Sequence, residues 1–199
     1  MKEHPALKNL FTEVVSGKYG WDRWGLLGIL SDYVLNYVDG DIIEIGCGES
    51  SIYFSQLAEK YNRRCYHVEY SKSGVENMTN TQGYFGMNSD VFRMTSNEFF
   101  NSGAISLNPP SIALAFIDGD HNYGQAKRDY LNIVHRVVNG GYIFLHDTLP
   151  PDKSWIVPEK CGKVYKLRME LEAAEHLEVF SFDKSAFNVG LTMVRKLHH

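Results

Sequence analysis

Short apolar runs alternate with amphipathic stretches through the middle of the chain. The runs at 41–48, 64–70, 112–118 and 140–147 have the length and β-rich composition of buried strands, and a weaker run lies at 90–94. Apolar residues at helical spacing predict helices over 51–62, from about residue 71, over 96–100 and over 123–138. Strands that alternate with helices in this way predict a parallel sheet covered on both faces.

The two ends of the chain extend this pattern. Residues 21–38 predict a helix that covers the sheet or a site, and the runs 177–182 and 187–196 predict an antiparallel hairpin at one sheet edge. Gly140 and Gly141 are expected to close the long helix before the fifth strand.

The predicted fold is therefore α/β, a single-domain, Rossmann-like, doubly wound sheet, mostly parallel with a C-terminal antiparallel hairpin. We divide the chain into an N-terminal helical cap at 1–39 and the main domain at 40–197. The terminal residues 198–199 resemble a remnant of a purification tag.

Composition and charge narrow the function. The chain has 199 residues, 44% of them hydrophobic, which suits one buried core. A formal charge of −4 argues against a surface built for nucleic acid or anionic membrane, and no apolar run reaches the length of about 18 residues that a membrane span needs. We expect a soluble, cytoplasmic protein that acts on a small molecule. The three cysteines are widely spaced and predict neither a disulfide nor a zinc site.

Polar residues gather where the predicted strands end. The first strand runs into a turn with Gly46 and Gly48, where a backbone can approach an anionic ligand. Ser51 stands where a dinucleotide fingerprint has its third glycine, which weakens the interpretation as an NAD or FAD site. Glu69 follows the second strand and suits the two hydroxyls of a ribose. Because parallel strands end at one edge, Glu44, Glu69, Asp118 and Asp147 should lie along one rim.

Four motifs carry a resemblance to a known family. "DIIEIGCGESS", "YHVEYS", "FIDGDHNY" and "GGYIFLHDT", in this order and spacing, resemble the class I S-adenosylmethionine-dependent methyltransferases. The last two motifs look most like the metal-dependent O-methyltransferases of the catechol and caffeoyl-CoA type and like the macrocin O-methyltransferase group. The resemblance implies transfer of a methyl group from S-adenosylmethionine to a hydroxyl of a small molecule or sugar.

The resemblance also implies the residues that bind the methyl donor. Gly46 and Gly48 would pass close to its amino acid end, with Glu44 and Ser50 or Ser51 near its carboxylate and amine. Glu69 would hold the ribose hydroxyls. Thr95 or Ser96 would lie beside the adenine, and Asp118 near the methyl end.

On the acceptor side, the resemblance implies a Mg²⁺ ion held by Asp118 and Asp147. Two carboxylates suit this ion, which lowers the pKa of a bound hydroxyl. His121 falls where the catechol-type enzymes have a lysine base, and an imidazole can take that role near neutral pH. His146 precedes the second aspartate, where it could be the third ligand, a second base or a structural histidine. A metal-free enzyme that uses His121 alone is a further alternative.

Two other classes of function stay open. One is a nucleotide-binding module without catalysis, and the other is an NAD-dependent oxidoreductase. The full set of rim acids together with His121 argues against the first, and Ser51 argues against the second.

Overall fold

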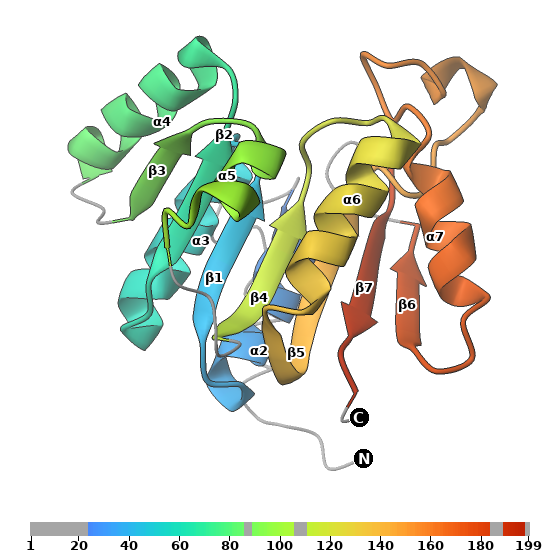
Figure 1. Cartoon of the computed structure of the whole chain (residues 1–199), viewed down its shortest axis with the longest axis horizontal. Helices are drawn as coiled ribbons and strands as arrows, with labels where there is room; N and C mark the ends of the chain where they lie inside the picture. Colours follow the sequence, from blue (N-terminus) through green and yellow to red (C-terminus); the bar gives the residue numbers. More distant parts are fainter. Residues whose placement is uncertain (1–23, 86–88, 106–110, 184–188, 198–199) are drawn as a thin grey trace.

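A seven-stranded mixed sheet forms the centre of the protein (Figure 1). The computed structural model describes residues 24–85, 89–105, 111–183 and 189–197. The strand order is β3-β2-β1-β4-β5-β7-β6. The strands are β1 (Asp41–Ile45), β2 (Cys65–Glu69), β3 (Asp90–Arg93), β4 (Ile112–Ile117), β5 (Val137–His146), β6 (Glu178–Phe182) and β7 (Leu191–Arg195). The first five are parallel, whereas β7 runs antiparallel between β5 and β6.

Helices cover both faces of this sheet (Figure 1). The helices are α2 (Gly25–Tyr37), α3 (Ser50–Tyr61), α4 (Lys72–Phe85), α5 (Ser96–Ser102), α6 (Tyr123–Val134) and α7 (Val164–Glu172), with a short 3₁₀ turn at Lys153–Trp155. Helices α2 and α3 pack on one face, and α5, α6 and α7 pack on the other. The doubly wound fold expected from the sequence is confirmed.

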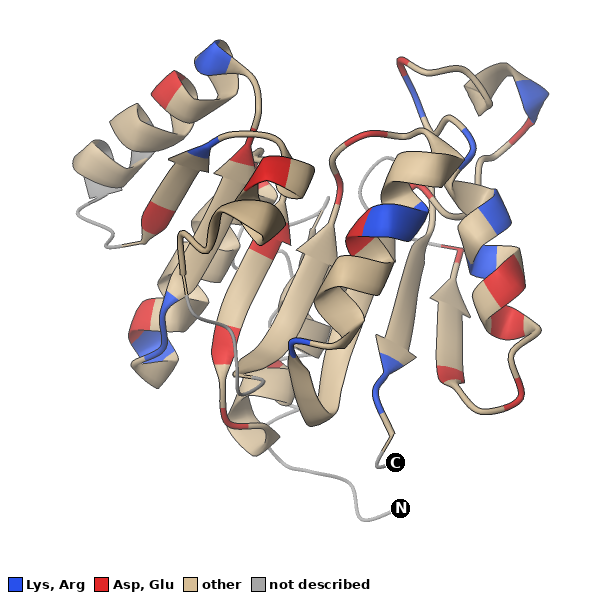
Figure 2. Ribbon diagram, viewed as in Figure 1, with Lys and Arg blue, Asp and Glu red and all other residues tan. Residues whose placement is uncertain are grey.

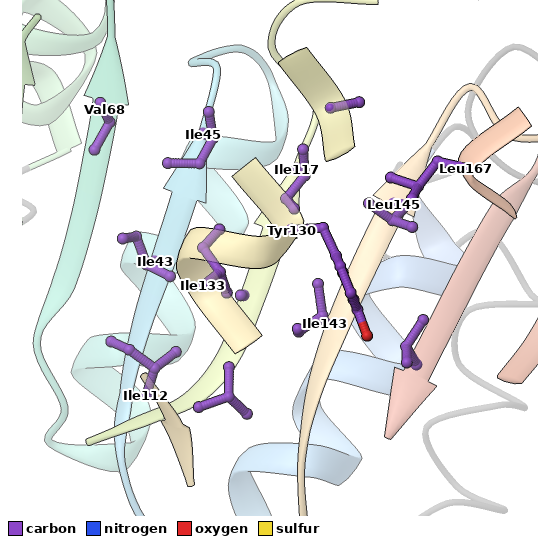
Figure 3. Packing of buried hydrophobic residues seen from close by; sticks show 14 of the residues in the cluster. Ile43, Ile45, Val68, Ile112, Ile117, Tyr130, Ile133, Ile143, Leu145 and Leu167 are labelled. Carbon is purple, nitrogen blue, oxygen red and sulfur yellow. The ribbon is translucent and has the colours of Figure 1, made fainter. Parts of the chain in front are cut away.

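Strand alternation divides the core into two layers. Ile43 and Ile45 of β1 and Val68 of β2 point toward α5–α7, where they share a buried cluster with Ile133 of α6 (Figure 3). Their neighbours along β1 point the other way, because successive side chains in a strand face opposite sides. Ile42 accordingly packs with Phe54, Leu57 and other residues of the α2–α3 layer. The same alternation sends the side chain of Glu44 beneath α3, where it meets Ser50 and Ser51.

One boundary predicted from the sequence is wrong. The long helix α6 ends at Val134 rather than at the glycine pair, and the strand β5 has already begun at Val137. Gly140, with φ of +81°, lies within β5, where the register against β4 shifts. The glycines therefore accommodate an irregularity in a strand, for which the β-branched pair Val137 and Val138 is better suited than for a helix end.

Several predicted features lie outside the described residues. These are residues 1–23 of the N-terminal cap, including Tyr19 and Trp21, most of the hairpin turn, and the terminal residues 198–199. Within the described part of the chain, the cap consists of Trp24 and α2, which pack against β4 and α3. No helix among the described residues is both long enough and apolar enough to cross a membrane.

Candidate functional site

A cavity of about 510 Å³ opens at the carboxyl ends of β1 to β4. It lies beside the switch point between β1 and β4, where the strand order reverses and where open α/β sheets bind their ligands. Five of the residues predicted for the site line this cavity: Gly46, Glu69, Thr95, Ser96 and Asp118. Its volume lies within the range of about 300–1,000 Å³ that is usual for small-molecule sites.

Gly46 brings two strand ends close together. Its φ is +90°, and a Cβ atom at this position would lie 2.2 Å from the carbonyl oxygen of Asp118. Only glycine fits there, because both the backbone conformation and the close approach exclude a side chain. A Cβ at Gly48, in contrast, would meet nothing within 4 Å, so the structure requires no glycine at that position.

Glu69 connects the glycine turn to the second strand. Its carboxylate accepts a hydrogen bond from the backbone N–H of Cys47 at 2.9 Å and another from the N–H of Ser71 at 2.6 Å. Each carboxylate oxygen has more than one lone pair, so capacity remains for ligand hydroxyls on the cavity side. The backbone thus holds the Glu69 carboxylate in a fixed orientation in the cavity wall.

Glu44, Ser50 and Ser51 form a buried network beneath the turn instead of lining the cavity. The Glu44 carboxylate is fully buried and accepts hydrogen bonds from Ser50 Oγ at 2.5 Å and Ser51 Oγ at 2.6 Å. It also lies 2.6 Å from Nδ1 of the buried His67. Contact of these side chains with the methyl donor stays a prediction, while the geometry gives them a supporting position under α3.

The same network explains why a serine replaces the third fingerprint glycine. Ser51 Oγ accepts a hydrogen bond from the backbone N–H of Gly48 at 3.0 Å while it donates to Glu44. One hydroxyl therefore satisfies a backbone donor of the turn and a buried carboxylate together. A glycine at position 51 would remove both bonds.

At the far end of the cavity, Ser96 and Thr95 have different partners. Thr95 is the N-cap residue immediately before α5 and forms a capping box with Glu98, so its hydroxyl is engaged by the first turn of that helix. Ser96 Oγ donates to Asp129 Oδ1 at 2.6 Å, and Gln125 Nε2 donates to the same oxygen at 2.8 Å. Sequence reasoning missed Gln125 and Asp129, both of which line the cavity. The available signal was an aspartate on the buried stripe that Ala126, Tyr130 and Ile133 define on α6.

A second cluster adjoins the cavity through Asp118. Ligand atoms of Asp118, His121 and Asp147 all lie within 4.8 Å of one another. His121 Nε2 is 3.0 Å from Asp147 Oδ2 and 3.9 Å from Asp118 Oδ1. Asp147 has a φ of +59°, a left-handed conformation that aspartate tolerates better than most residues and that is often found at functional sites.

His146 lies deeper than this cluster. Its Nδ1 is 3.2 Å from Asp118 Oδ1 and 3.6 Å from Asp147 Oδ2, and its ring is 4% exposed. The ring of Trp24 packs over it, with a centroid distance of 5.0 Å. His146 thus contacts both aspartates from the core side.

Residues 158–163, in the segment that follows Asp147, hold the backbone and the ring of His121 in place. The backbone carbonyl of His121 accepts a hydrogen bond from Lys163 N at 2.9 Å. A Cβ at Gly162 would lie 2.2 Å from that same carbonyl oxygen. The imidazole also has a hydrogen bond to the backbone of Pro158. These contacts join distant parts of the chain, so no local pattern of residues predicts them.

The two aspartates and two histidines change one another's pKa values. For His146, burial opposes the charged ring, but the charges of Asp118 and Asp147 and their hydrogen bonds raise the pKa to about 10. The hydrogen bond that the His121 ring donates to Asp147 raises the pKa of His121. For Asp147, burial favours the neutral acid, yet hydrogen bonds from His121 and His146 hold the pKa well below its usual range. Without a metal ion, the negative charges of the two aspartates and the positive charges of the two histidines thus compensate one another.

Solved structures of known proteins share this fold. A proposed caffeoyl-CoA O-methyltransferase from Staphylococcus aureus is 15% identical, covers 94% of this chain and 91% of its own, and superposes with a TM-score of 0.68. An S-adenosylhomocysteine-bound methyltransferase from Podospora anserina is 16% identical, with coverage of 98% and 89% and a TM-score of 0.67. An rRNA methylase from Streptococcus thermophilus is 12% identical, with coverage of 85% and 95% and a TM-score of 0.59.

The sequence comparisons identify the family. No curated protein sequence matches the chain. A family profile described as a methyltransferase domain matches residues 43–148, which is more than half of the chain. The match begins in β1 and ends just beyond β5, so it includes the glycine turn, Glu69 and both aspartates of the second cluster. The chain therefore belongs to this methyltransferase-domain family and is an S-adenosylmethionine-dependent methyltransferase of class I.

Proposed function

We propose that this methyltransferase acts on a hydroxyl group of a small molecule and that a divalent cation held by Asp118, His121 and Asp147 assists the transfer. The observation that carries the proposal is the convergence of two carboxylates and an imidazole within 4.8 Å. Asp118 belongs both to this cluster and to the wall of the cavity. The acceptor would therefore meet the methyl donor at Asp118.

The volume and the lining residues of the cavity suit S-adenosylmethionine. Gly46 allows the turn after β1 to lie directly against the backbone of Asp118, where any side chain would collide, and so shapes the cavity wall at this strand end. Glu69 offers carboxylate lone pairs for ribose hydroxyls, and Ile45, Val68 and Met94 supply apolar surface for the base.

The second cluster fits one metal ion. Oxygen and nitrogen ligands lie about 2 Å from a divalent cation, so the ligand atoms around one ion are roughly 3–4 Å apart. The spacing of the three side chains is close to this value. Two carboxylates suit Mg²⁺, and the imidazole extends the range to Mn²⁺ and related ions.

We assign the third ligand position to His121 in place of His146, which the sequence had suggested. The His121 ring nitrogen completes the compact cluster with both aspartates. His146 packs beneath Trp24 and contacts the aspartates from the core. Of the three roles considered for His146, the structure favours the hydrogen-bonded structural histidine.

In this mechanism the protein mainly aligns the two substrates. Gly46 and Glu69 would hold the donor, and Asp118 would fix the acceptor relative to the donor methyl group, and such alignment can supply a large part of the rate enhancement. A bound cation would lower the pKa of the acceptor hydroxyl. Without a cation, His121 would receive the hydroxyl proton.

A small acceptor is favoured over RNA, although an rRNA methylase shares the fold. The cavity is lined by four acidic side chains, Glu69, Asp118, Asp120 and Asp129. Two of the four, Asp118 and Asp120, lie in the loop that follows β4 (Figure 2). A phosphate backbone would be repelled by this edge, whereas RNA-binding surfaces carry positive charge.

Isothermal titration calorimetry tests the donor and the metal separately. We expect S-adenosylmethionine to bind the wild-type protein, and Glu69→Ala to weaken that binding. Titration of Mg²⁺ or Mn²⁺ should give heat with the wild-type protein and none with Asp147→Asn. Asp152→Asn is the matched control, because it removes an exposed carboxylate from the same region of the chain.

Turnover then tests the acceptor class. Release of S-adenosylhomocysteine would be followed with catechol-type and sugar hydroxyl acceptors, with a divalent cation or with EDTA. We expect Asp118→Ala to abolish turnover and Asp152→Asn to retain it. Full activity of Asp118→Ala would refute the proposed site, and full activity in EDTA would refute the role of the cation.

A further inference from the structure

A buried carboxylate that does not belong to the metal cluster lines the cavity. Asp129 lies on α6 and is 1% exposed, yet it lines the cavity. A carboxylate in such a position is costly unless hydrogen bonds or charges compensate it. No step of methyl transfer that we have described uses this residue.

Only one of its two oxygens is engaged by the described residues. Ser96 Oγ and Gln125 Nε2 both donate to Oδ1, at 2.6 and 2.8 Å. Gln125 Nε2 also lies 3.0 Å from Ser96 Oγ, and Asn97 Nδ2 donates to Gln125 Oε1 at 3.2 Å. This network fixes the plane of the carboxylate and leaves Oδ2 as an acceptor of further hydrogen bonds.

The surroundings indicate what this acceptor would meet. Glu69 ends β2, between the glycine turn after β1 and the residues Met94 and Ser96 that follow β3, so a ribose held by Glu69 with its amino acid end at the turn would have its base near Met94, Ser96 and the α6 residues that line the cavity. Adenine carries an exocyclic amine, which donates hydrogen bonds, whereas hypoxanthine and guanine carry a carbonyl oxygen at the same ring position. A fixed carboxylate accepts from the amine and repels the carbonyl oxygen.

We infer that Asp129 recognises the exocyclic amine of the adenine base and thereby selects adenosyl over inosyl ligands. The inference rests on the proposed binding of S-adenosylmethionine in this cavity. Asp129 would be a specificity-determining residue that Ser96 and Gln125 hold in place. Loss of a hydrogen bond to a charged group corresponds to a preference of about 10- to 100-fold.

The test compares S-adenosylhomocysteine with S-inosylhomocysteine by calorimetry. The wild-type protein should bind the adenosyl compound about 10- to 100-fold more tightly. In Asp129→Asn, the amide oxygen can still accept from Ser96 and Gln125, and the amide nitrogen would present a donor to the cavity. This variant should therefore lose or reverse the preference, which a merely destabilised protein would not do. Glu59→Gln, which changes an exposed residue of α3, should keep the wild-type preference.

The outcomes separate this inference from the proposed function. Equal affinity of the wild-type protein for the two compounds would overturn the role of Asp129, and this measurement needs no variant. An unchanged preference in Asp129→Asn would overturn it as well. If the wild-type protein bound neither compound, the proposed function would fail and the inference with it.

Discussion

Replacing Ser51 with alanine should reveal how much the buried network beneath the glycine turn contributes to stability. Ser51 is fully buried, and its hydroxyl donates to the Glu44 carboxylate at 2.6 Å and accepts from Gly48 N at 3.0 Å. A hydrogen bond to a charged group contributes about 1.5–3 kcal/mol, and a bond to a backbone amide contributes about 1 kcal/mol. Because the glutamate stays buried, we expect a total loss of roughly 2.5–4 kcal/mol.

Urea unfolding followed by circular dichroism measures this loss. At a typical slope of about 1–3 kcal/mol/M, the midpoint should fall by roughly 1–4 M. Ser73→Ala is the matched control, since Ser73 is also the second residue of a helix, α4, but is exposed. We expect Ser73→Ala to change the free energy of unfolding by less than about 0.5 kcal/mol.

The difference between the two serine variants shows whether the Ser51 hydroxyl stabilises the glycine turn and the buried Glu44 carboxylate. If Ser51→Ala costs no more than about 1 kcal/mol beyond Ser73→Ala, the hydroxyl is not holding the turn and the carboxylate together. The explanation given for serine in place of the third fingerprint glycine would then be wrong.

Three further predictions concern the turn and the metal cluster. Gly46→Ala should weaken the binding of S-adenosylhomocysteine, measured by calorimetry, at least about tenfold, because the new Cβ would lie 2.2 Å from the carbonyl oxygen of Asp118. Gly48→Ala should have a smaller effect, because a Cβ at that position meets nothing within 4 Å. Gly162→Ala should lower kcat about tenfold or more while the affinity for the donor is kept, since it displaces the backbone of His121 and lies outside the cavity wall; an unchanged kcat would contradict this. In EDTA, the free energy of unfolding should fall as the pH rises from about 7 to about 10. Folding raises the pKa of His146 from 6.5 to about 10. The charged ring therefore stabilises the folded state fully below pH 6.5, and this stabilisation is lost as the pH rises through the folded-state pKa. Urea unfolding of His146→Gln should show a flatter dependence on pH, and an equal slope in both proteins would contradict the assignment.

The pattern of the sequence determined the fold and the approximate position of the site. Alternating apolar and amphipathic segments specify which stretches become strands and helices, and parallel strands bring their carboxyl ends to one edge. These two rules are enough to bring Gly46, Glu69 and Asp118 to one cavity and Asp147 to the neighbouring strand end. The end of α6 was misplaced because a glycine pair fits both a helix end and an irregular strand.

The tertiary structure alone decided the partners of each side chain. Glu44 was predicted at the rim, but its place in the alternation of β1 turns it toward Ser51 and His67 beneath α3. Asp129 is one acid among many in the sequence, and only the packing of α6 on the sheet brings it to the cavity. Hydrogen bonds and burial depend on contacts between residues far apart in the chain, whereas periodicity records only which way each residue faces within its own element.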